Sequence, residues 1–368
     1  MKHAIVVVTL LAVATPAWAQ LGGIGGAMRK AQQAQDAKKK IDDLTFSDEE
    51  ERTLGEDVSV KIRQRFGVVQ DPAVHKYVTL VGTAIAQQSE RANLNWMFIV
   101  LDTDGVNAFA SPGGFVHITR GALGLMKNES ELAGVLGHEI GHVVRKHTIN
   151  AIKKNSAVKL GTQAASERSA FIGAVANVAY DNILENAYDR GDELDADKFS
   201  VQITPKLGYA PMSIGDFLTR LADRNKSQPQ RNGLFASHPE TQERIKKVGE
   251  LARAFKTTAT VEPRYKSNIK YEPVDIASIA VVTEGAAGLA GSSGAAKEPE
   301  KKEEPKRGVP LAGLKTTVAP EKQSAQVSAS GGARGVGQDR FAKGGGNPNP
   351  VKVTVSAAEV DAFKKGIS

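Results

Sequence analysis

The chain has 368 residues, contains no cysteine and carries a formal net charge of +7 at pH 7. The lack of cysteine excludes disulfide bonds and thiolate metal ligands. The basic charge permits weak attraction to anionic membrane surfaces, but no motif with interleaved aromatic residues indicates nucleic-acid binding.

The first 19 residues have the pattern of a secretory signal peptide. A basic start at Lys2 precedes an apolar run over residues 4–13, and the motif Ala-Trp-Ala ends at Ala19. An uncleaved anchor is the alternative, but this run is short for a bilayer span. We therefore expect cleavage after Ala19 and export, most simply to a bacterial periplasm. No later stretch predicts a transmembrane segment in the mature chain.

Residues 20–46 form a leader that starts rich in glycine and continues rich in Gln, Ala and Lys. Ser47 then has the character of a helix cap, with Glu50 at the third helical position. We expect helices over residues 47–66 and 71–90, separated by a break at Gly67.

Two strands are predicted next. Residues 95–101 are almost entirely apolar or aromatic and end at an Asp-Thr-Asp-Gly turn. Residues 115–119 alternate after the turn Ser111-Pro112-Gly113-Gly114.

A long helix follows, with Asn128 as cap and Glu131 three residues on, and should run to about His147. Further helices are expected within residues 151–204 and at about 210–224 and 239–256. Apolar residues between 170 and 188 permit a membrane interpretation, but packing against a core explains them more simply. The prediction is an α+β, mainly helical fold, with a small sheet beside the long helix.

The C-terminal quarter differs in composition. Residues 271–350 read as a low-complexity linker or tail, rich in Gly, Ser, Ala, Lys, Glu and Pro, which is expected to be disordered. Residues 351–368 regain regular patterning and could dock on the main domain or on a partner. The folded domain is therefore expected over residues 47–270.

The long helix carries the sequence His138-Glu139-Ile140-Gly141-His142, an HExxH motif. Residues four apart share one face of a helix, so the two imidazoles can bind one cation. Glu139 then stands where it can take a proton from a water molecule beside that cation. This five-residue pattern can also occur by chance, so the surrounding sequence must show whether it marks a metal site.

A catalytic zinc site usually has three protein ligands. Glu193 and Asp197, four apart on a later predicted helix, are candidates for the third. One carboxylate could bind the metal while the other orients a ligating histidine. Spacing alone is a weak indication, because acidic helix faces are usually solvated.

Several motifs in order resemble one family across about residues 47–256. HEIGH is followed 51 residues after His142 by Glu193-x-x-Ala-Asp197, and residues 107–114 read NAFASPGG. Thr119-Arg120-Gly121, Ser237-His238-Pro239 and Arg244-Ile245 add to the match. These motifs are similar to those of gluzincin metallopeptidases of the HtpX/BepA type, which include the CAAX prenyl proteases.

The resemblance implies a zincin-like fold and one Zn²⁺ per chain. It implies that His138, His142 and Glu193 bind this ion, that Glu139 is the base and that Asp197 orients a ligand. It also implies that residues 115–119 form the edge strand to which an extended substrate adds. Candidate substrate-binding residues in this region are Asn107 and Gly114.

Three further histidines have alternative interpretations. The resemblance implies that His238 approaches the zinc site, where it would stabilise the developing oxyanion or occupy the open metal position; a loop histidine before a proline is the alternative. His147 lies nearly half a turn from the ligand face, so we expect it to be structural or exposed. His117 could line the cleft or belong to ordinary strand surface.

The expected function is a zinc endopeptidase acting on polypeptides of the cell envelope. The family resemblance implies misfolded or misassembled outer-membrane proteins as its substrates. The transmembrane helices of HtpX and the helical-repeat module of BepA are not seen in this sequence. The rival hypothesis is an envelope chaperone or binding protein with a silent zinc site, against which the intact Glu139 argues. A non-peptidase zinc hydrolase is disfavoured by the edge-strand element.

Overall fold

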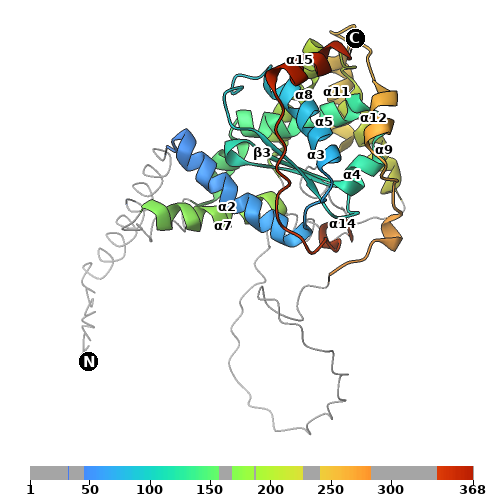
Figure 1. Ribbon diagram of the computed structural model, residues 1–368. Helices are drawn as coiled ribbons and strands as arrows, with labels where there is room; N and C mark the ends of the chain where they lie inside the picture. Colours follow the sequence, from blue (N-terminus) through green and yellow to red (C-terminus); the bar gives the residue numbers. More distant parts are fainter. Residues whose placement is uncertain are drawn as a thin grey trace, which may run out of the picture.

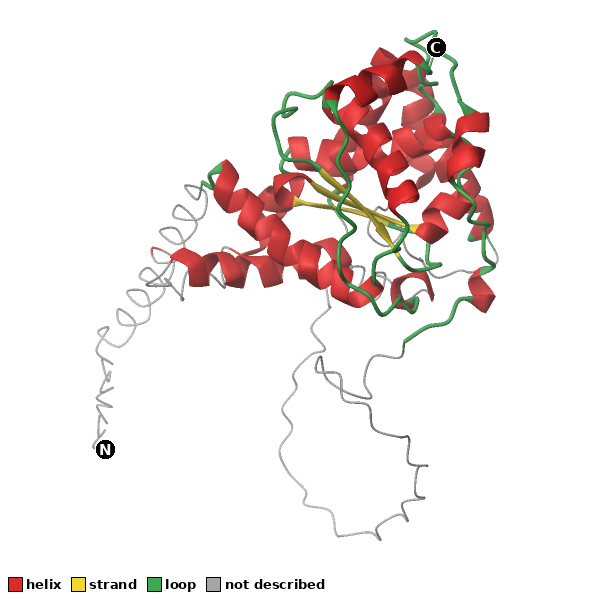
Figure 2. Ribbon diagram, viewed as in Figure 1, coloured by secondary structure: helices red, strands yellow, loops and turns green. Residues whose placement is uncertain are grey.

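The computed structural model describes residue 32 and residues 45–156, 168–185, 188–226, 241–282 and 338–367. The expected signal peptide and His238 lie outside these residues. Helices surround a small central sheet (Figures 1 and 2), which confirms the predicted mainly helical α+β class. Among the described helices, none combines the length and apolarity needed to cross a bilayer.

In chain order, the α-helices of the described residues are α2 (Asp48–Phe66), α3 (Pro72–Ala86), α4 (Arg120–Leu125), α5 (Glu129–Val144), α6 (His147–Ser156), α7 (Arg168–Glu185), α8 (Arg190–Ile203), α9 (Ser213–Arg224), α11 (Thr241–Ala252), α12 (Glu262–Asn268), α14 (Gln338–Phe341) and α15 (Ala357–Lys365). Short 3₁₀ turns are η1 (Pro112–Gly114), η3 (Thr204–Leu207) and η4 (Ile276–Ser278).

The sheet has three strands: β1 (Met97–Leu101), β2 (Ala108–Ser111) and β3 (Phe115–Thr119), in the order β1-β3-β2. β3 pairs in parallel with β1 and antiparallel with β2. The expectation that residues 115–119 form an edge strand was therefore wrong. The unpredicted strand β2 covers that side, because η1 contains two glycines with positive φ that turn the chain back within three residues.

Both faces of the sheet are buried, because side chains of a strand alternate between its faces. On one face, Phe98 and Val116 join a core that includes residues of α3 and α5. On the other face, Ile99 and Phe115 pack with residues of α2 and α7. The two helices of this second layer, α2 and α7, lie side by side in Figure 1. The sheet is thus the middle layer of the fold.

The predicted helix starts are confirmed at two places. Ser47 and Glu50 form a reciprocal capping box at α2, and the Asn128 side chain accepts a hydrogen bond from the backbone N–H of Glu131 at α5. The end of α5 differs from the prediction, because this helix ends at Val144 and not near His147. Lys146 has a φ of 56°, a left-handed conformation that interrupts the helix before α6 begins.

Small residues bring α5 and α8 close together. A Cβ atom on Gly137 would lie 3.1 Å from Ser200 Oγ, and one on Gly141 would lie 3.1 Å from the Phe199 side chain. Ala196 is fully buried at the same contact. Larger side chains on α5 would therefore force the two helices apart. This close packing sets the distance between the HExxH motif on α5 and the acidic residues on α8.

Residues 338–367 pack against the domain. The trace from α14 to α15 crosses the molecule in Figure 1, and Gly345 N–H donates to the carbonyl oxygens of Phe66 and Asp102. α15 then lies on α3, where Phe363 and Ile367 are buried. Chain far beyond the expected domain end at residue 270 thus contributes to the core.

Candidate metal centre

His138 and His142 project from the same face of α5 toward Glu193 on α8. The Nε2 atoms of the two histidines lie 3.0 Å apart. Glu193 Oε2 lies 3.6 Å from His138 Nε2, and Glu193 Oε1 lies 3.4 Å from His142 Nε2. The structure thus brings the three predicted ligand residues together in one buried cluster.

The spacing of these donor atoms fits a tetrahedral cation. With metal–nitrogen and metal–oxygen distances of about 2.0–2.2 Å, ligand atoms of a tetrahedral zinc site are about 3.3 Å apart. The measured separations of 3.0, 3.4 and 3.6 Å bracket that value. Two imidazoles and one carboxylate are also a known ligand set for catalytic zinc. The residues present therefore fit a bound zinc ion.

Asp197 and Arg244 support the cluster from behind. Asp197 Oδ1 lies 2.9 Å from His138 Nδ1, which leaves Nε2 of that ring directed at the cluster. Arg244, on α11, donates to both oxygens of Asp197 at 2.7 Å, and its Nη1 lies 2.8 Å from Glu193 Oε2. Burial raises the pKa of Asp197, but the charge and hydrogen bonds of Arg244 and His138 outweigh it and lower this pKa to about 2.

The formal charges of this buried group also suit a divalent cation. Glu139, Glu193 and Asp197 are at most 1% exposed, and so is Arg244. Three carboxylates and one guanidinium give these four side chains together a formal charge of −2. Because isolated buried charge is costly, a cation of charge +2 balances the group.

Glu139 is fully buried on α5, beside His138 in the chain. Its negative charge acts on two other residues of the site. Burial is the main cause of the raised pKa of Tyr188, and the Glu139 charge adds to it. For Arg244, burial lowers the pKa, but the charges of Asp197, Glu193 and Glu139 outweigh burial and raise it. Glu139 therefore belongs to the same electrostatic group as the three donor residues.

Two aromatic residues that sequence reasoning left out or set aside surround His142. The Tyr188 ring stacks on the His142 ring with 3.9 Å between centroids, and its hydroxyl is hydrogen-bonded to Thr148 Oγ1 at 2.9 Å. His147 is 4% exposed and its Nδ1 lies 3.0 Å from His142 Nδ1. His147 was expected to be structural or exposed, and the structure shows that it is not exposed. The break in the helix at Lys146 lets the His147 ring contact His142.

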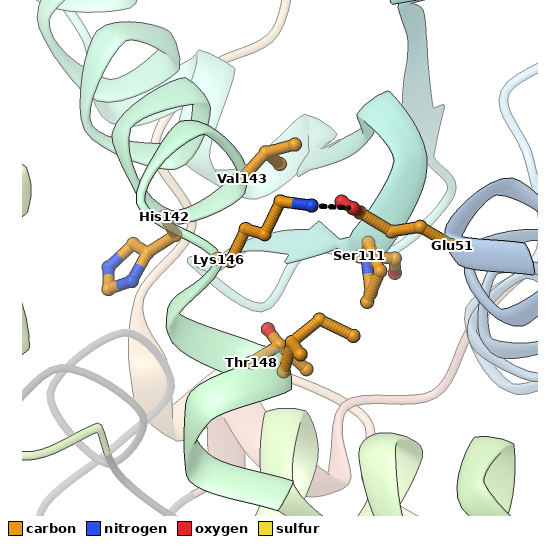
Figure 3. Close-up of a pocket in the computed structure, with 8 residues that line it drawn as sticks. Glu51, Ser111, His142, Val143, Lys146 and Thr148 are labelled. Carbon is orange, nitrogen blue, oxygen red and sulfur yellow. Dashed lines mark ion pairs between the residues drawn. The ribbon is translucent and has the colours of Figure 1, made fainter. Parts of the chain in front are cut away.

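A shallow recess adjoins the cluster at the end of α5 (Figure 3). Lys146 Nζ and Glu51 Oε2 form an ion pair there at 2.9 Å, and the His142 ring points away from this pair. The walls of the recess come from α2, the end of β2 and the α5–α6 junction. The residues that line it are Glu51, Ser111, Pro112, His142, Val143, Lys146, Thr148 and Ile149. The recess therefore connects the end of β2 with a donor residue of the cluster.

Asn107 and Gly114, the predicted substrate-binding residues, have local structural contacts. Asn107 is 7% exposed, its side-chain oxygen accepts from the Ala108 N–H, and its backbone N–H donates to Thr119 Oγ1. Gly114 is buried in the η1 turn with a φ of 95°. His117 is also fully buried and lies 2.9 Å from Ser59 Oγ, so it does not line an open surface.

Comparison with known sequences bears on the same residues. The sequence pattern of peptidase family M48 matches residues 72–252, a range that contains the HExxH motif, Glu193, Asp197 and Arg244. The chain belongs to peptidase family M48.

Individual relatives agree with this family assignment. The chain is 25% identical over 226 residues to the beta-barrel assembly-enhancing protease of Yersinia pestis, an alignment that covers 59% of this chain and 46% of that protein. It is 31% identical over 150 residues to the metalloprotease YcaL of Escherichia coli, covering 40% and 58%. With the metalloprotease LoiP of Escherichia coli it shares 24% identity over 221 residues, covering 57% and 83%. The chain thus spans about half the length of several curated relatives.

Proposed function

We propose that this chain is a zinc-dependent endopeptidase in which His138, His142 and Glu193 bind one zinc ion and Glu139 is the general base. The observation that carries the proposal is the buried three-donor cluster on α5 and α8, with Glu139 next to its first histidine. Membership of a peptidase family and relatives named as metalloproteases support it.

The residues of the site have separate tasks in this proposal. A zinc ion, when bound, supplies Lewis acidity that polarises the scissile carbonyl and makes water a stronger acid. The Glu139 carboxylate accepts the proton of the attacking water and delivers it to the nitrogen of the leaving amine. Asp197 holds the His138 ring in one orientation, and Arg244 fixes the carboxylates of Asp197 and Glu193.

The substrate class follows from the edge of the sheet. β2 is an outer strand of the described sheet, it packs beside α5, and its end at Ser111 borders the recess next to His142. The four residues of β2 are buried, so in this proposal the chain that covers them moves aside and an extended polypeptide adds to the edge through backbone hydrogen bonds. A peptide bond of the substrate would then lie beside the cluster. We therefore propose unfolded or locally extended polypeptides as substrates, with β2 in the role first expected of residues 115–119.

The cell envelope is the proposed location. The sequence of residues 1–19 predicts export, and several relatives are named for enhancing beta-barrel assembly. Quality control of envelope proteins, including outer-membrane proteins, accounts for both observations. Peripheral contact with an anionic membrane surface is compatible with the net charge of +7.

The decisive experiment compares wild type with Glu139→Gln for zinc content and for cleavage of casein as an unfolded substrate. Both proteins should bind one zinc ion per chain, and the variant should lose cleavage by at least about 100-fold, as is typical when general base catalysis is removed. Glu56→Gln, an exchange at a half-exposed residue of α2, is the matched control and should cleave normally.

The rival hypothesis of a chaperone with a silent site makes a different prediction. In that case wild type and Glu139→Gln would both bind zinc, neither would cleave casein, and both would suppress its aggregation equally. That result would contradict the peptidase proposal.

A further inference from the structure

His147 meets His142 although the two residues are five positions apart in the chain. On a continuous helix, residues five apart differ by about 140° in direction and do not face each other. The chain avoids this because α5 ends at Val144 and Lys146 takes a left-handed conformation with a φ of 56°. α6 therefore begins at His147 as a separate helix, and His147 Nδ1 lies 3.0 Å from His142 Nδ1.

The left-handed residue is held in place by its own contacts. A non-glycine residue in this conformation is strained, so it persists only when the surroundings fix it. Lys146 Nζ pairs with Glu51 Oε2 at 2.9 Å, and the Lys146 carbonyl accepts the Asn150 N–H of α6 at 2.9 Å. Glu51 is itself buried and bound by Arg91, so this anchor is fixed to α2. The position of His147 is thus built into the fold.

The 3.0 Å contact between the two rings determines which nitrogen carries each proton. His142 directs Nε2 at the cluster, where it must offer a lone pair to bind a metal ion. A neutral His142 ring then carries its proton on Nδ1 and donates it to Nδ1 of His147. Nδ1 of His147 must in turn be free of a proton, which leaves the His147 proton on Nε2.

The carboxylates near Nε2 of His147 suit this arrangement. Asp195 Oδ2 lies 3.5 Å and Asp192 Oδ1 lies 3.8 Å from that nitrogen. Both residues are on α8, the helix that also carries Glu193. His138 reaches a carboxylate directly through Asp197, whereas His142 reaches carboxylates through a second imidazole.

We propose that His147 is a positioning residue that holds His142 in the tautomer able to bind metal, with Asp195 and Asp192 orienting His147 in turn. This inference rests on the proposed metal site but concerns metal binding and not peptide cleavage. A histidine ligand whose other ring nitrogen lacks its partner typically loses about 10- to 100-fold in metal affinity.

The test measures the zinc dissociation constant by competition with a chromophoric chelator. His147→Phe keeps a ring of similar size but has no nitrogen, so its zinc affinity should fall by about 10- to 100-fold. His147→Asn places an amide oxygen near the position of Nδ1 and should restore most of that loss. Asp195→Asn should give a smaller loss than His147→Phe, since Asp192 remains. Lys198→Gln, an exposed exchange on α8, is the matched control and should bind zinc as wild type does.

A second readout separates positioning from a merely structural role. In zinc-loaded protein labelled with ¹⁵N at histidine, the His142 Nδ1 resonance should show a directly bonded proton, and the His147 proton should reside on Nε2. Thermal unfolding of the metal-free variants shows whether the fold is retained; if His147→Phe does not fold, the comparison of His147→Asn and Asp195→Asn with wild type decides. Equal zinc affinity in wild type and His147→Phe, or a His147 proton on Nδ1, would overturn the inference. Zinc-loaded wild type that cleaves nothing would instead contradict only the proposed peptidase function.

Discussion

Arg244 Nη1 lies 2.8 Å from Glu193 Oε2, so a fully buried guanidinium stands directly behind a predicted metal ligand. The same guanidinium donates to both oxygens of Asp197 at 2.7 Å. One side chain on α11 therefore connects the carboxylate that faces the cluster to the carboxylate that orients His138. Burial lowers the pKa of Arg244, but the charges of Asp197 and Glu193 outweigh this and raise it.

The first prediction concerns the loss of this guanidinium. Arg244→Met leaves the two carboxylates buried without their counter-charge, so the metal-free protein should lose about 3–5 kcal/mol of unfolding free energy. Zinc should recover part of the loss, because a divalent cation again balances the carboxylates. Urea unfolding with and without zinc measures both effects.

Arg190→Met is the matched control for that experiment. Arg190 also pairs with a glutamate, Glu243, but 62% of its side chain is exposed. Exposed pairs contribute about 1 kcal/mol or less, so this variant should unfold close to wild type. Equal losses of unfolding free energy in the two variants would show that the buried Arg244 ion pairs stabilise the fold no more than the exposed Arg190 ion pair.

The second prediction is a dependence of stability on pH that arises at His117. This residue is fully buried. Burial outweighs the effect of a hydrogen bond with the Phe109 backbone and, together with the Arg63 charge, lowers the pKa of His117 from 6.5 to about 3. Below pH 6.5 the unfolded chain binds a proton at this position while the folded protein does not. Stability from the neutral ring is therefore complete above pH 6.5 and is lost as the pH falls toward 3.

His117→Gln removes this titration and keeps a polar side chain near Ser59. The difference in unfolding free energy between wild type and variant should shrink by up to about 1.4 kcal/mol for each pH unit between 6 and 4. Urea unfolding at pH 7.5, 6, 5 and 4 measures it, with the value at pH 7.5 as each protein's own reference. If the unfolding free energies of the two proteins changed with pH in parallel, His117 would not be the source of the pH dependence.

The third prediction concerns residues 338–367. Val360, Phe363 and Ile367 are at most 8% exposed, and Asp339 binds Arg224. Burying side chains of this kind contributes about 1.5–3 kcal/mol each, so ending the chain at Gly337 should reduce the unfolding free energy by on the order of 5 kcal/mol. Chemical denaturation of the truncated protein measures the loss.

Two single exchanges test whether packing causes that effect. Phe363→Ala should cost about 3 kcal/mol, since it empties a buried site. Asp361→Ala changes a side chain that is 68% exposed on the same helix and should leave stability within about 0.5 kcal/mol. A truncated protein as stable as wild type would show that this segment adds nothing to the fold.

The sequence by itself determined the features that depend on residues close together in the chain, such as helix starts and side chains that share one helix face. Ser47 and Glu50, and Asn128 and Glu131, mark helix starts because a cap acts within one turn. His138 and His142 share a face because four residues make about one helical turn. Glu193 and Asp197 were recognised because they share a face and match a family motif.

Contacts between distant segments were decided only by the tertiary structure. An arginine in an amphipathic helix is ordinarily solvated, so nothing in the sequence around Arg244 indicated burial between two carboxylates. β2 has only four residues, and its place at the edge depends on the turn at η1 and on pairing with β3. His147 reaches His142 because one left-handed residue, Lys146, interrupts the helix between them. Lys146 forms an ion pair with Glu51, which is 95 positions earlier in the sequence. Side-chain spacing along one helix determines that His138 and His142 form a ligand pair. Long-range packing determines which residues support the predicted ligands, namely Arg244 and His147.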